Sequence, residues 1–142
     1  MRLFIELSFN GSNFHGWQIQ PNANTIQAEL NKALSAILNN VISVVGAGRT
    51  DAGVHAKQMF AHFDFEGDFE TEILLTKLNS FLLNDISIHQ IFKVDKNANA
   101  RFDAISRTYQ YYITNEKSPF NKNIYLHYKT LDIDAMNLTC KY

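Results

Sequence analysis

The sequence has little cysteine, little proline and no excess of positive charge. Cys140 is the only cysteine among 142 residues, which excludes an internal disulfide and a metal site built from several cysteines. Two prolines leave no proline-rich linker. The 13 Lys and Arg residues against 14 Asp and Glu residues give a formal net charge of -1, so the chain lacks the basic character of a domain that holds nucleic acid by charge alone.

Long apolar runs are also missing from the sequence. No stretch approaches the ~18 apolar residues of a membrane span, and Glu6 interrupts the apolar start of the chain where a signal peptide would need its apolar core. We therefore expect a soluble, cytoplasmic protein with no membrane partner. The 46% hydrophobic and 19% charged content is ordinary for a globular protein, and the length suffices for one domain with a proper core.

Four stretches show the pattern of β-strands. Apolar residues alternate over residues 3–9, and residues 41–45 form a short β-branched apolar run typical of a buried strand. Residues 59–66 alternate again, with His62 on the polar face. A fourth strand is expected over residues 86–94.

Two stretches show the spacing of helices between these strands. Apolar side chains recur on one helical face over residues 26–37, with Asn24 or Thr25 as the N-cap, and a second such pattern covers residues 74–82. The order strand, helix, strand, strand, helix, strand is that of a ferredoxin-like βαββαβ unit. We expect an α+β fold, ferredoxin-like or RRM-like, with a mostly antiparallel sheet and both helices on one face.

The end of the chain departs from this pattern. Residues 107–114 predict an extra strand that places Tyr109 and Tyr111 on the same face. Residues 118–121 then break the pattern, and residues 132–136 predict the start of a helix that continues to the end of the sequence.

The strongest chemical pattern lies between the second and third expected strands. Residues 48–56 (GRTDAGVHA) place one carboxylate, Asp51, between Arg49 and His55. The stretch is not a dinucleotide fingerprint, because Asp51 stands where that motif needs its last glycine and a strand pattern follows where a helix is required. It is not a phosphate loop either, because the lysine is missing. Local chemistry leaves open whether Asp51 is catalytic or only satisfies loop amides or pairs with Arg49.

The histidines and aromatic residues near this stretch have simpler interpretations. His55 and His62, with the neighbouring aspartates, lack the spacing of a metal-binding motif, so no metal site is expected. We expect His55 to brace the loop instead. Phe14 and Trp17 are either core residues or flank a pocket.

Residues 48–56 resemble the signature of the TruA family of tRNA pseudouridine synthases, in which Gly-Arg-Thr-Asp-Ala-Gly-Val-His carries the catalytic aspartate. Two further stretches agree in the expected order. They are Gly11 followed by FHGWQIQ (residues 14–20) and TIQ (residues 25–27), and ARFDA (residues 100–104) followed by RTYQY (residues 107–111). The resemblance spans nearly the whole chain.

This resemblance implies one half of the pseudouridine synthase catalytic fold and assigns three site residues. Asp51 would be the nucleophile, and Tyr109 would lie against the target base. Arg49 would bind substrate, and it is the nearest candidate for a cation that keeps Asp51 ionised. The resemblance implies no metal and no cofactor. The family often has Phe-His where this chain has Ala98 and Asn99, a change that touches none of the three residues.

The resemblance also implies an activity, a partner and a domain arrangement. The expected enzyme isomerises uridine to pseudouridine in the anticodon stem and loop of tRNA, and acts as a homodimer. Residues 1–115 would form the N-terminal half-domain that carries the catalytic loop. Residues 116–142 would form the connection and the start of a second half-domain that is cut off.

Two other functions compete with this one. A non-catalytic RRM-like RNA-binding module uses the same scaffold with aromatic side chains on its strands, although the sequence has no RNP1-like string. A hydrolase with an aspartate nucleophile would act on a small substrate and show turnover without tRNA.

Overall fold

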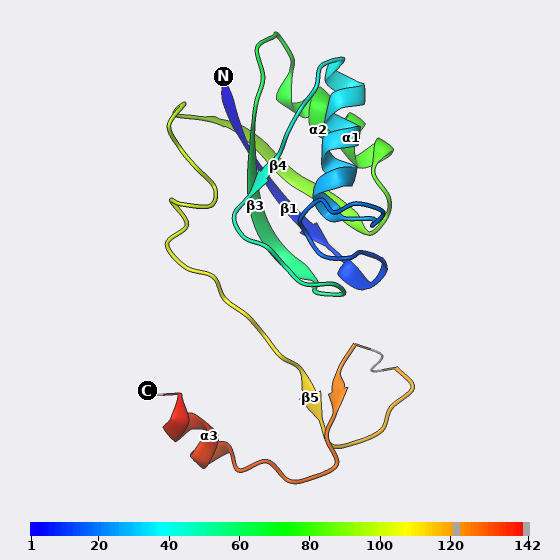
Figure 1. Cartoon of the computed structure of the whole chain (residues 1–142), viewed down its shortest axis with the longest axis vertical. Helices are drawn as coiled ribbons and strands as arrows, with labels where there is room; N and C mark the ends of the chain where they lie inside the picture. The colour runs from blue at the N-terminus through cyan, green and yellow to red at the C-terminus, as the bar shows by residue number, and fades with distance from the viewer. Residues whose placement is uncertain (121–122, 141–142) are drawn as a thin grey trace. The chain divides into compact units, whose positions relative to one another are not determined.

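The computed structural model describes residues 1–120 and 123–140, and the chain divides into two compact units, residues 1–105 and residues 106–142 (Figure 1). The first unit contains the sheet and the two helices expected from the sequence. The second contains a short strand pair and a third helix.

The first unit is a four-stranded sheet with two helices on one face (Figure 1). Its strand order is β2-β3-β1-β4, and all neighbouring strands pair antiparallel. The α+β class and the ferredoxin-like βαββαβ order are therefore confirmed. The elements are β1 (Arg2–Phe9), the 3-10 helix η1 (Gly11–Asn13), α1 (Ile26–Leu38), β2 (Val45–Gly46), β3 (Ala56–Asp64), α2 (Thr71–Phe81) and β4 (Ile86–Val94).

The hydrophobic core lies between the sheet and the two helices. Every second side chain of β1 is buried, and Leu3, Ile5 and Leu7 are fully inaccessible. Leu34 of α1 and Leu78 of α2 are equally buried. Full burial of such a side chain contributes ~1.5–3 kcal/mol, and a slip of one residue would move the whole set in β1 to the other face. The core therefore fixes the register of β1 against β3, the strand that follows the Asp51 loop.

The strand expected over residues 41–45 is shorter and less buried than predicted. Only Val45 and Gly46 form β2, which pairs with β3. Burial alternates before it, because Ile42 and Val44 are buried while the residues on either side of them are exposed.

Polar side chains of α1 explain this difference, because they bind the backbone that would otherwise join the sheet. Ser35 Oγ accepts a hydrogen bond from the Ile42 amide at 2.9 Å, and Asn31 Oδ1 accepts one from the Val44 amide at 2.9 Å. Gln27 Nε2 donates to the Val44 carbonyl oxygen at 2.7 Å. Residues four apart share one helical face, so these three side chains form a row that takes the place of a neighbouring strand.

Polar residues cap both ends of α1, and the N-cap is one of the two that the sequence predicted. Thr25 is the N-cap, and its hydroxyl accepts a hydrogen bond from the Ala28 amide at 3.4 Å. Asn39 ends the helix with a φ of 50°, a left-handed conformation that asparagine tolerates better than most residues.

The strand expected over residues 107–114 is mostly missing from the described chain. Only β5 (Ile113–Thr114) forms a strand, and it pairs in parallel with β6 (Tyr125–Leu126). Tyr109 and Tyr111 are 67% and 91% exposed. The prediction was wrong because alternating aromatic residues stabilise a strand only where a paired strand and a packed face receive them.

The helix expected from residue 132 is present as α3 (Ile133–Thr139). Asp132 caps it by accepting a hydrogen bond from the Ala135 amide at 2.9 Å. The expected continuation to the end of the sequence falls on residues 141–142, which lie outside the described residues. The two units divide after Ile105, and the half-domain boundary expected after residue 115 stays a prediction.

Candidate active site

Asp51 lies on the loop between β2 and β3, as the sequence predicted. It is exposed, and within residues 1–120 and 123–140 its carboxylate forms no hydrogen bond or ion pair. Arg49 is also exposed and makes no ion pair with Asp51 in this part of the chain. Arg49 and Asp51 thus form no ion pair among the described residues, and the role of Arg49 as a cationic neighbour stays a prediction. The carboxylate is accessible to a substrate.

The predicted site residues are divided between the two units. Asp51 and Arg49 belong to the first unit, whereas Tyr109 belongs to the second, where its side chain is 67% exposed. The role of Tyr109 against the target base stays a prediction.

The backbone on both sides of Asp51 is held by the loop that precedes α1. The Trp17 amide donates a hydrogen bond to the Thr50 carbonyl oxygen at 3.2 Å, and the Gly53 amide donates one to the Phe14 carbonyl oxygen at 3.2 Å. Phe14 and Trp17 are 3% and 2% exposed, so these bonds start from residues anchored in the core. The two aromatic residues are thus core residues, and they position Asp51 through backbone contacts.

Two glycines let these loops approach each other. Gly16 has a φ of +85°, and a Cβ there would lie well within 3.0 Å of the Thr50 carbonyl oxygen. A Cβ at Gly11 would collide in the same way with the Val54 carbonyl oxygen. Only glycine fits where one backbone packs this closely on another. The two glycines of the first motif therefore pack on the backbone on either side of Asp51, Gly16 at Thr50 and Gly11 at Val54.

His55 braces the same loop, as expected. Its Nδ1 accepts a hydrogen bond from the Gly11 amide at 3.0 Å. A ring nitrogen accepts only when it carries no proton, so this contact places the proton of neutral His55 on Nε2. His55 therefore joins the two motifs.

The hydroxyl of Thr50 is a feature that the sequence did not reveal. Its Oγ1 atom is buried and has no hydrogen-bond partner among the described residues. Leaving a buried hydroxyl unpaired is unfavourable by ~1–3 kcal/mol. Because Thr50 precedes Asp51 directly, this unpaired group lies next to the candidate nucleophile.

A second polar cluster lies at the opposite end of the sheet, where Arg2 pairs with Asp64 across β1 and β3. Arg2 donates from Nε and Nη2 to the two carboxylate oxygens of Asp64 at 2.9 and 2.8 Å. The hydrogen bond from Arg2 lowers the pKa of Asp64. His62 lies beside Phe4, on the face of β3 opposite Ala61 and Phe63 as the alternation predicted, yet it is only 4% exposed. Ala100 covers it and donates its amide to His62 Nδ1 at 3.1 Å.

Burial, followed by the nearby positive charge of Arg2, lowers the pKa of His62. The alternating pattern of β3 cannot signal this burial, because the covering residue comes from a segment nearly forty positions later.

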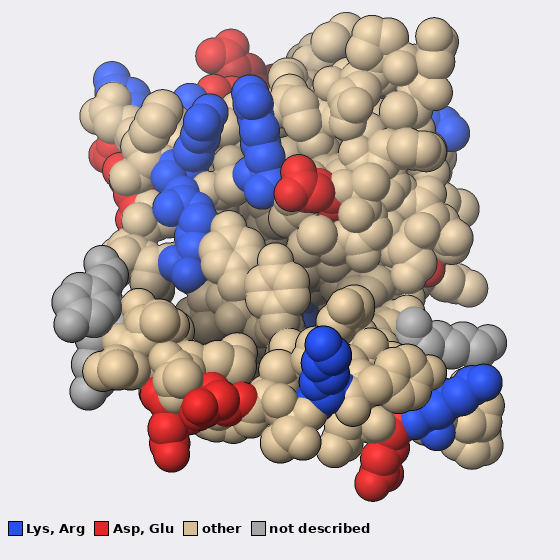
Figure 2. Space-filling model, turned by 60° about the horizontal axis from the view of Figure 1, so that its bottom comes forward, with Lys and Arg blue, Asp and Glu red and all other residues tan. Residues whose placement is uncertain are grey.

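The face drawn in Figure 2 shows no single extended basic area. On the face shown in Figure 2, basic side chains occur in small groups separated by acidic and neutral surface. In the part of the chain that the structure describes, no three His, Cys, Asp or Glu side chains gather in a way that could hold a metal ion. None of the described helices has the length and apolar character needed to cross a membrane.

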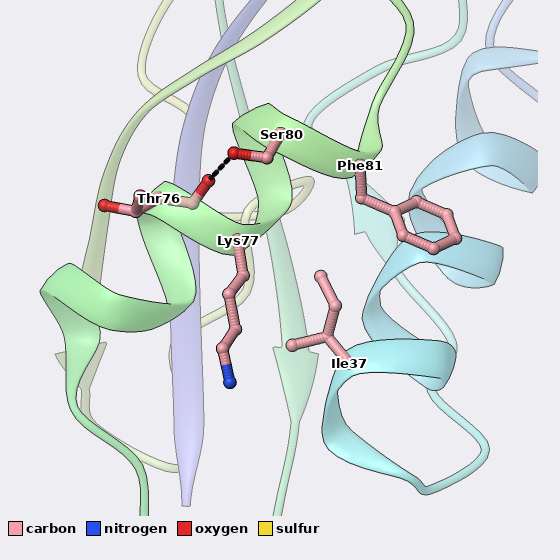
Figure 3. Close-up of a pocket in the computed structure, with 5 residues that line it drawn as sticks. All are labelled: Ile37, Thr76, Lys77, Ser80 and Phe81. Atoms are coloured by element: carbon pink, nitrogen blue, oxygen red, sulfur yellow. Dashed lines mark hydrogen bonds between the residues drawn. The ribbon is translucent and has the colours of Figure 1, made fainter.

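An open hollow of about 340 Å³ lies between the two helices of the first unit (Figure 3). It is lined by Ile37 of α1 and by Thr76, Lys77, Ser80 and Phe81 of α2. None of the predicted site residues lines it, so it is separate from the candidate site.

Known proteins are similar to this chain over most of its length. A family model described as tRNA pseudouridine synthase matches residues 7–103. A tRNA pseudouridine synthase A of Bacteroides thetaiotaomicron is 51% identical over 137 residues, which cover 96% of this chain and 51% of the relative. Proteins of the same name from Parabacteroides distasonis and Thermosipho melanesiensis are 50% and 44% identical over 99% of this chain, and 56% and 59% of their own lengths are covered.

The chain therefore spans slightly more than half the length of these relatives. The family match includes the Asp51 loop, the loop that clamps it, and the β3 and β4 strands. Because that match covers more than half of the sequence, the chain belongs to the tRNA pseudouridine synthase family.

Proposed function

We propose that the intact protein isomerises uridine to pseudouridine in the anticodon stem and loop of tRNA, with Asp51 as the nucleophile. The observation that carries this proposal is the pair of backbone hydrogen bonds that join the loop of Phe14 and Trp17 to Thr50 and Gly53, on either side of Asp51. We call this pair of bonds the clamp on Asp51. A carboxylate that is exposed, has no ion pair among the described residues and is held by backbone bonds on both sides suits attack on a substrate. In this proposal the protein acts as a homodimer in the cytoplasm, without a metal or a cofactor.

The reaction breaks the bond between uracil N1 and the ribose and forms a bond between uracil C5 and the same ribose carbon. A proton leaves C5 and N1 gains one, so nothing is oxidised or reduced. As nucleophile, Asp51 bonds to the substrate while the uracil turns, and it leaves when the carbon bond has formed. The carboxylate is thereby regenerated.

Tyr109 and Arg49 take the binding roles. A base buried in an RNA helix must be extruded before an enzyme can act on it, and stacking on an aromatic ring returns ~1–3 kcal/mol per base. The exposed ring of Tyr109 is available for this stacking. Arg49 is exposed two residues before Asp51, where its guanidinium can meet the RNA backbone or fill the space of the extruded base.

Release of tritium from the uracil C5 position of labelled tRNA tests the proposal. The intact protein is compared with its Asp51→Ala and Asp51→Asn variants, and tRNA binding is measured for all three. We expect release by the wild type alone and binding by all three proteins. Release by Asp51→Ala at the wild-type rate would remove Asp51 from the mechanism.

A non-catalytic RRM-like RNA-binding module is the second candidate, and aromatic side chains on the sheet face away from the helices favour it. Phe4 and Phe92 lie side by side on β1 and β4 with ring centroids 5.9 Å apart, and Phe92 is 37% exposed. RRM domains stack bases on strand aromatics of this kind. For this candidate, the wild type and both variants would bind tRNA and none would release tritium.

A further inference from the structure

The turn formed by Asn99–Asp103 follows β4 and is tied to the sheet on the face opposite the helices (Figure 1). It contains Arg101 and Phe102, and the Phe102 side chain is 77% exposed. The guanidinium carbon of Arg101 lies over the Phe102 ring, 5.6 Å from its centroid. An exposed ring beside a cation suits a nucleic acid, because the ring can stack on a base while the cation meets a phosphate.

His62 is the first of two anchors that fix this turn. Its ring stacks on Phe4, with centroids 5.9 Å apart and planes 23° apart, and the side chain is only 4% exposed. The Ala100 amide donates to Nδ1 at 3.1 Å. This nitrogen can accept only in the neutral ring, since both ring nitrogens carry protons in the charged form.

Arg2 is the second anchor. While two of its nitrogens hold Asp64, Nη1 donates to the Ala98 carbonyl oxygen at 2.9 Å. The guanidinium is thus oriented by β3 and binds the chain just before the turn. Because Arg2 and His62 bind residues 98 and 100, they fix the position and the direction of the segment that enters the turn.

The turn is closed by its own side chains. Asn99 Oδ1 accepts hydrogen bonds from the Arg101 amide at 3.0 Å and the Phe102 amide at 3.2 Å. Asp103 Oδ2 accepts one from the Asn99 amide at 2.7 Å. The turn is therefore a rigid piece whose placement on the sheet depends on the two anchors.

We propose that neutral His62 is a positioning residue for tRNA binding, which holds the turn so that Arg101 and Phe102 contact the RNA, and that protonation of His62 releases the turn. The inference rests on the proposed action on tRNA. It assigns a role to a buried histidine that has no part in the chemistry at Asp51. Acid should then weaken tRNA binding, whereas protonation of surface histidines alone would strengthen it.

The charged groups around His62 act in opposite directions. Arg2 on β1 disfavours the imidazolium, while Asp64 on β3 and Asp103 in the turn favour it, and burial together with Arg2 leaves the pKa of His62 below its ordinary value. Protonation removes the acceptor that the Ala100 amide has among the described residues, and it puts a charge in a buried site. Release of the turn lets the ring reach water.

Two substitutions of His62 in the intact protein separate this role from simple packing. His62→Phe keeps a ring that can stack on Phe4 but has no acceptor. His62→Asn places an oxygen near the position of Nδ1 and cannot be protonated. The dissociation constant for an unmodified tRNA transcript is measured at about pH 8 and about pH 5, on either side of the ordinary histidine pKa of ~6.5. Exchange of the Ala100 amide is followed in the same samples without RNA.

For the wild type we expect about tenfold weaker binding at the acidic pH, the factor that corresponds to ~1.4 kcal/mol. His62→Phe should bind about tenfold more weakly than wild type already at the basic pH, and His62→Asn should lose no affinity in acid. The effect should appear in KM, with kcat at saturating tRNA unchanged. The Ala100 amide should be protected in the wild type at basic pH and unprotected in His62→Phe.

Equal tRNA binding by the wild type and His62→Phe at basic pH would overturn the inference, as would the same acid loss in His62→Asn. In both cases turnover of tRNA would persist, so the proposed function would stand. If no variant bound tRNA while the Ala100 amide behaved as expected, the proposed function itself would fail and the RNA-binding role of the turn with it.

Discussion

Replacing Gly16 by alanine tests whether the first loop sets the position of Asp51. Gly16 has a φ of +85°, and a Cβ there would meet the Thr50 carbonyl oxygen and the Asp51 backbone. The left-handed backbone alone makes alanine unfavourable by ~1–2 kcal/mol. The collision with the Thr50 carbonyl oxygen adds to this loss of stability, because a backbone oxygen cannot rotate away as the end of a flexible side chain can. The Asp51 segment must move by on the order of 1 Å, a misplacement that can reduce turnover ~100-fold.

Gly53→Ala is the matched control. Gly53 also has a left-handed backbone, with a φ of +80°, but a Cβ there would have no neighbour within 4 Å. Its stability loss should therefore be limited to the backbone term of ~1–2 kcal/mol. Chemical denaturation of both variants isolates the contribution of the collision at Gly16.

Turnover of saturating tRNA by Gly16→Ala is the decisive measurement. We expect kcat to fall by ~10- to 100-fold, because a displaced nucleophile affects the chemical step more than binding. If Gly16→Ala matched Gly53→Ala in stability and kept the wild-type kcat, the close contact with the Asp51 backbone would not position the nucleophile.

Three further predictions concern stability and follow from individual contacts. Asn79 of α2 binds both the amide and the carbonyl oxygen of Ile88 in β4, at 2.8 and 2.9 Å. Asn79→Ala should therefore lower the unfolding free energy by ~2 kcal/mol. Ser80→Ala loses one exposed hydrogen bond and should change the unfolding free energy by less than ~0.5 kcal/mol. Thr50→Val removes the buried unpaired hydroxyl and should leave the melting temperature unchanged or raise it, and a clear decrease would show that Oγ1 has a partner. Because the pKa of His62 is lowered in the folded protein, the unfolded chain binds a proton more readily than the folded one, and stability should fall as the pH drops below ~6.5. In His62→Asn the denaturation midpoint should depend less on pH in that range.

The strands and helices of the first unit were predictable because burial decides them and burial is periodic in the sequence. The alternation in β1 and the helical spacing in α1 each reflect one buried face. The length of β2 was not predictable in this way. From the sequence, the polar residues Gln27, Asn31 and Ser35 of α1 have the pattern of a solvated helix face. In the structure they bind the backbone of residues 42–44. Periodicity separates polar from apolar residues and carries no information on which polar group binds which backbone.

The candidate site was predictable to a similar degree. Glycines and the end of a strand pattern place Asp51 on a loop, and the structure has it there. The clamp from Phe14 and Trp17 consists of backbone bonds between segments more than thirty residues apart, which leave no local pattern. The glycine at position 16 was the available signal, because a glycine between two buried aromatic residues marks a close approach of backbones.

The distance between Asp51 and the Arg101–Phe102 turn bears on the size of the substrate. Asp51 lies at the end of the sheet where Phe9 pairs with Ala56, and the turn is anchored at the other end, where Arg2 pairs with Asp64. The eight residues of β1 separate these ends by ~25 Å. A small molecule bound at Asp51 cannot reach the turn, which argues against a small-substrate hydrolase if both sites serve one function.

An RNA substrate can be shortened until it no longer spans this distance. Along duplex RNA, ~25 Å corresponds to roughly seven to nine base pairs, on the order of 3 Å each. A stem-loop shorter than that should be bound equally by the wild type and His62→Phe, because it engages the Asp51 end alone. Whole tRNA should distinguish the two proteins by about tenfold in KM. Equal discrimination with both substrates would mean that His62 affects the Asp51 end directly, and the two ends of the sheet would then not be separate contacts.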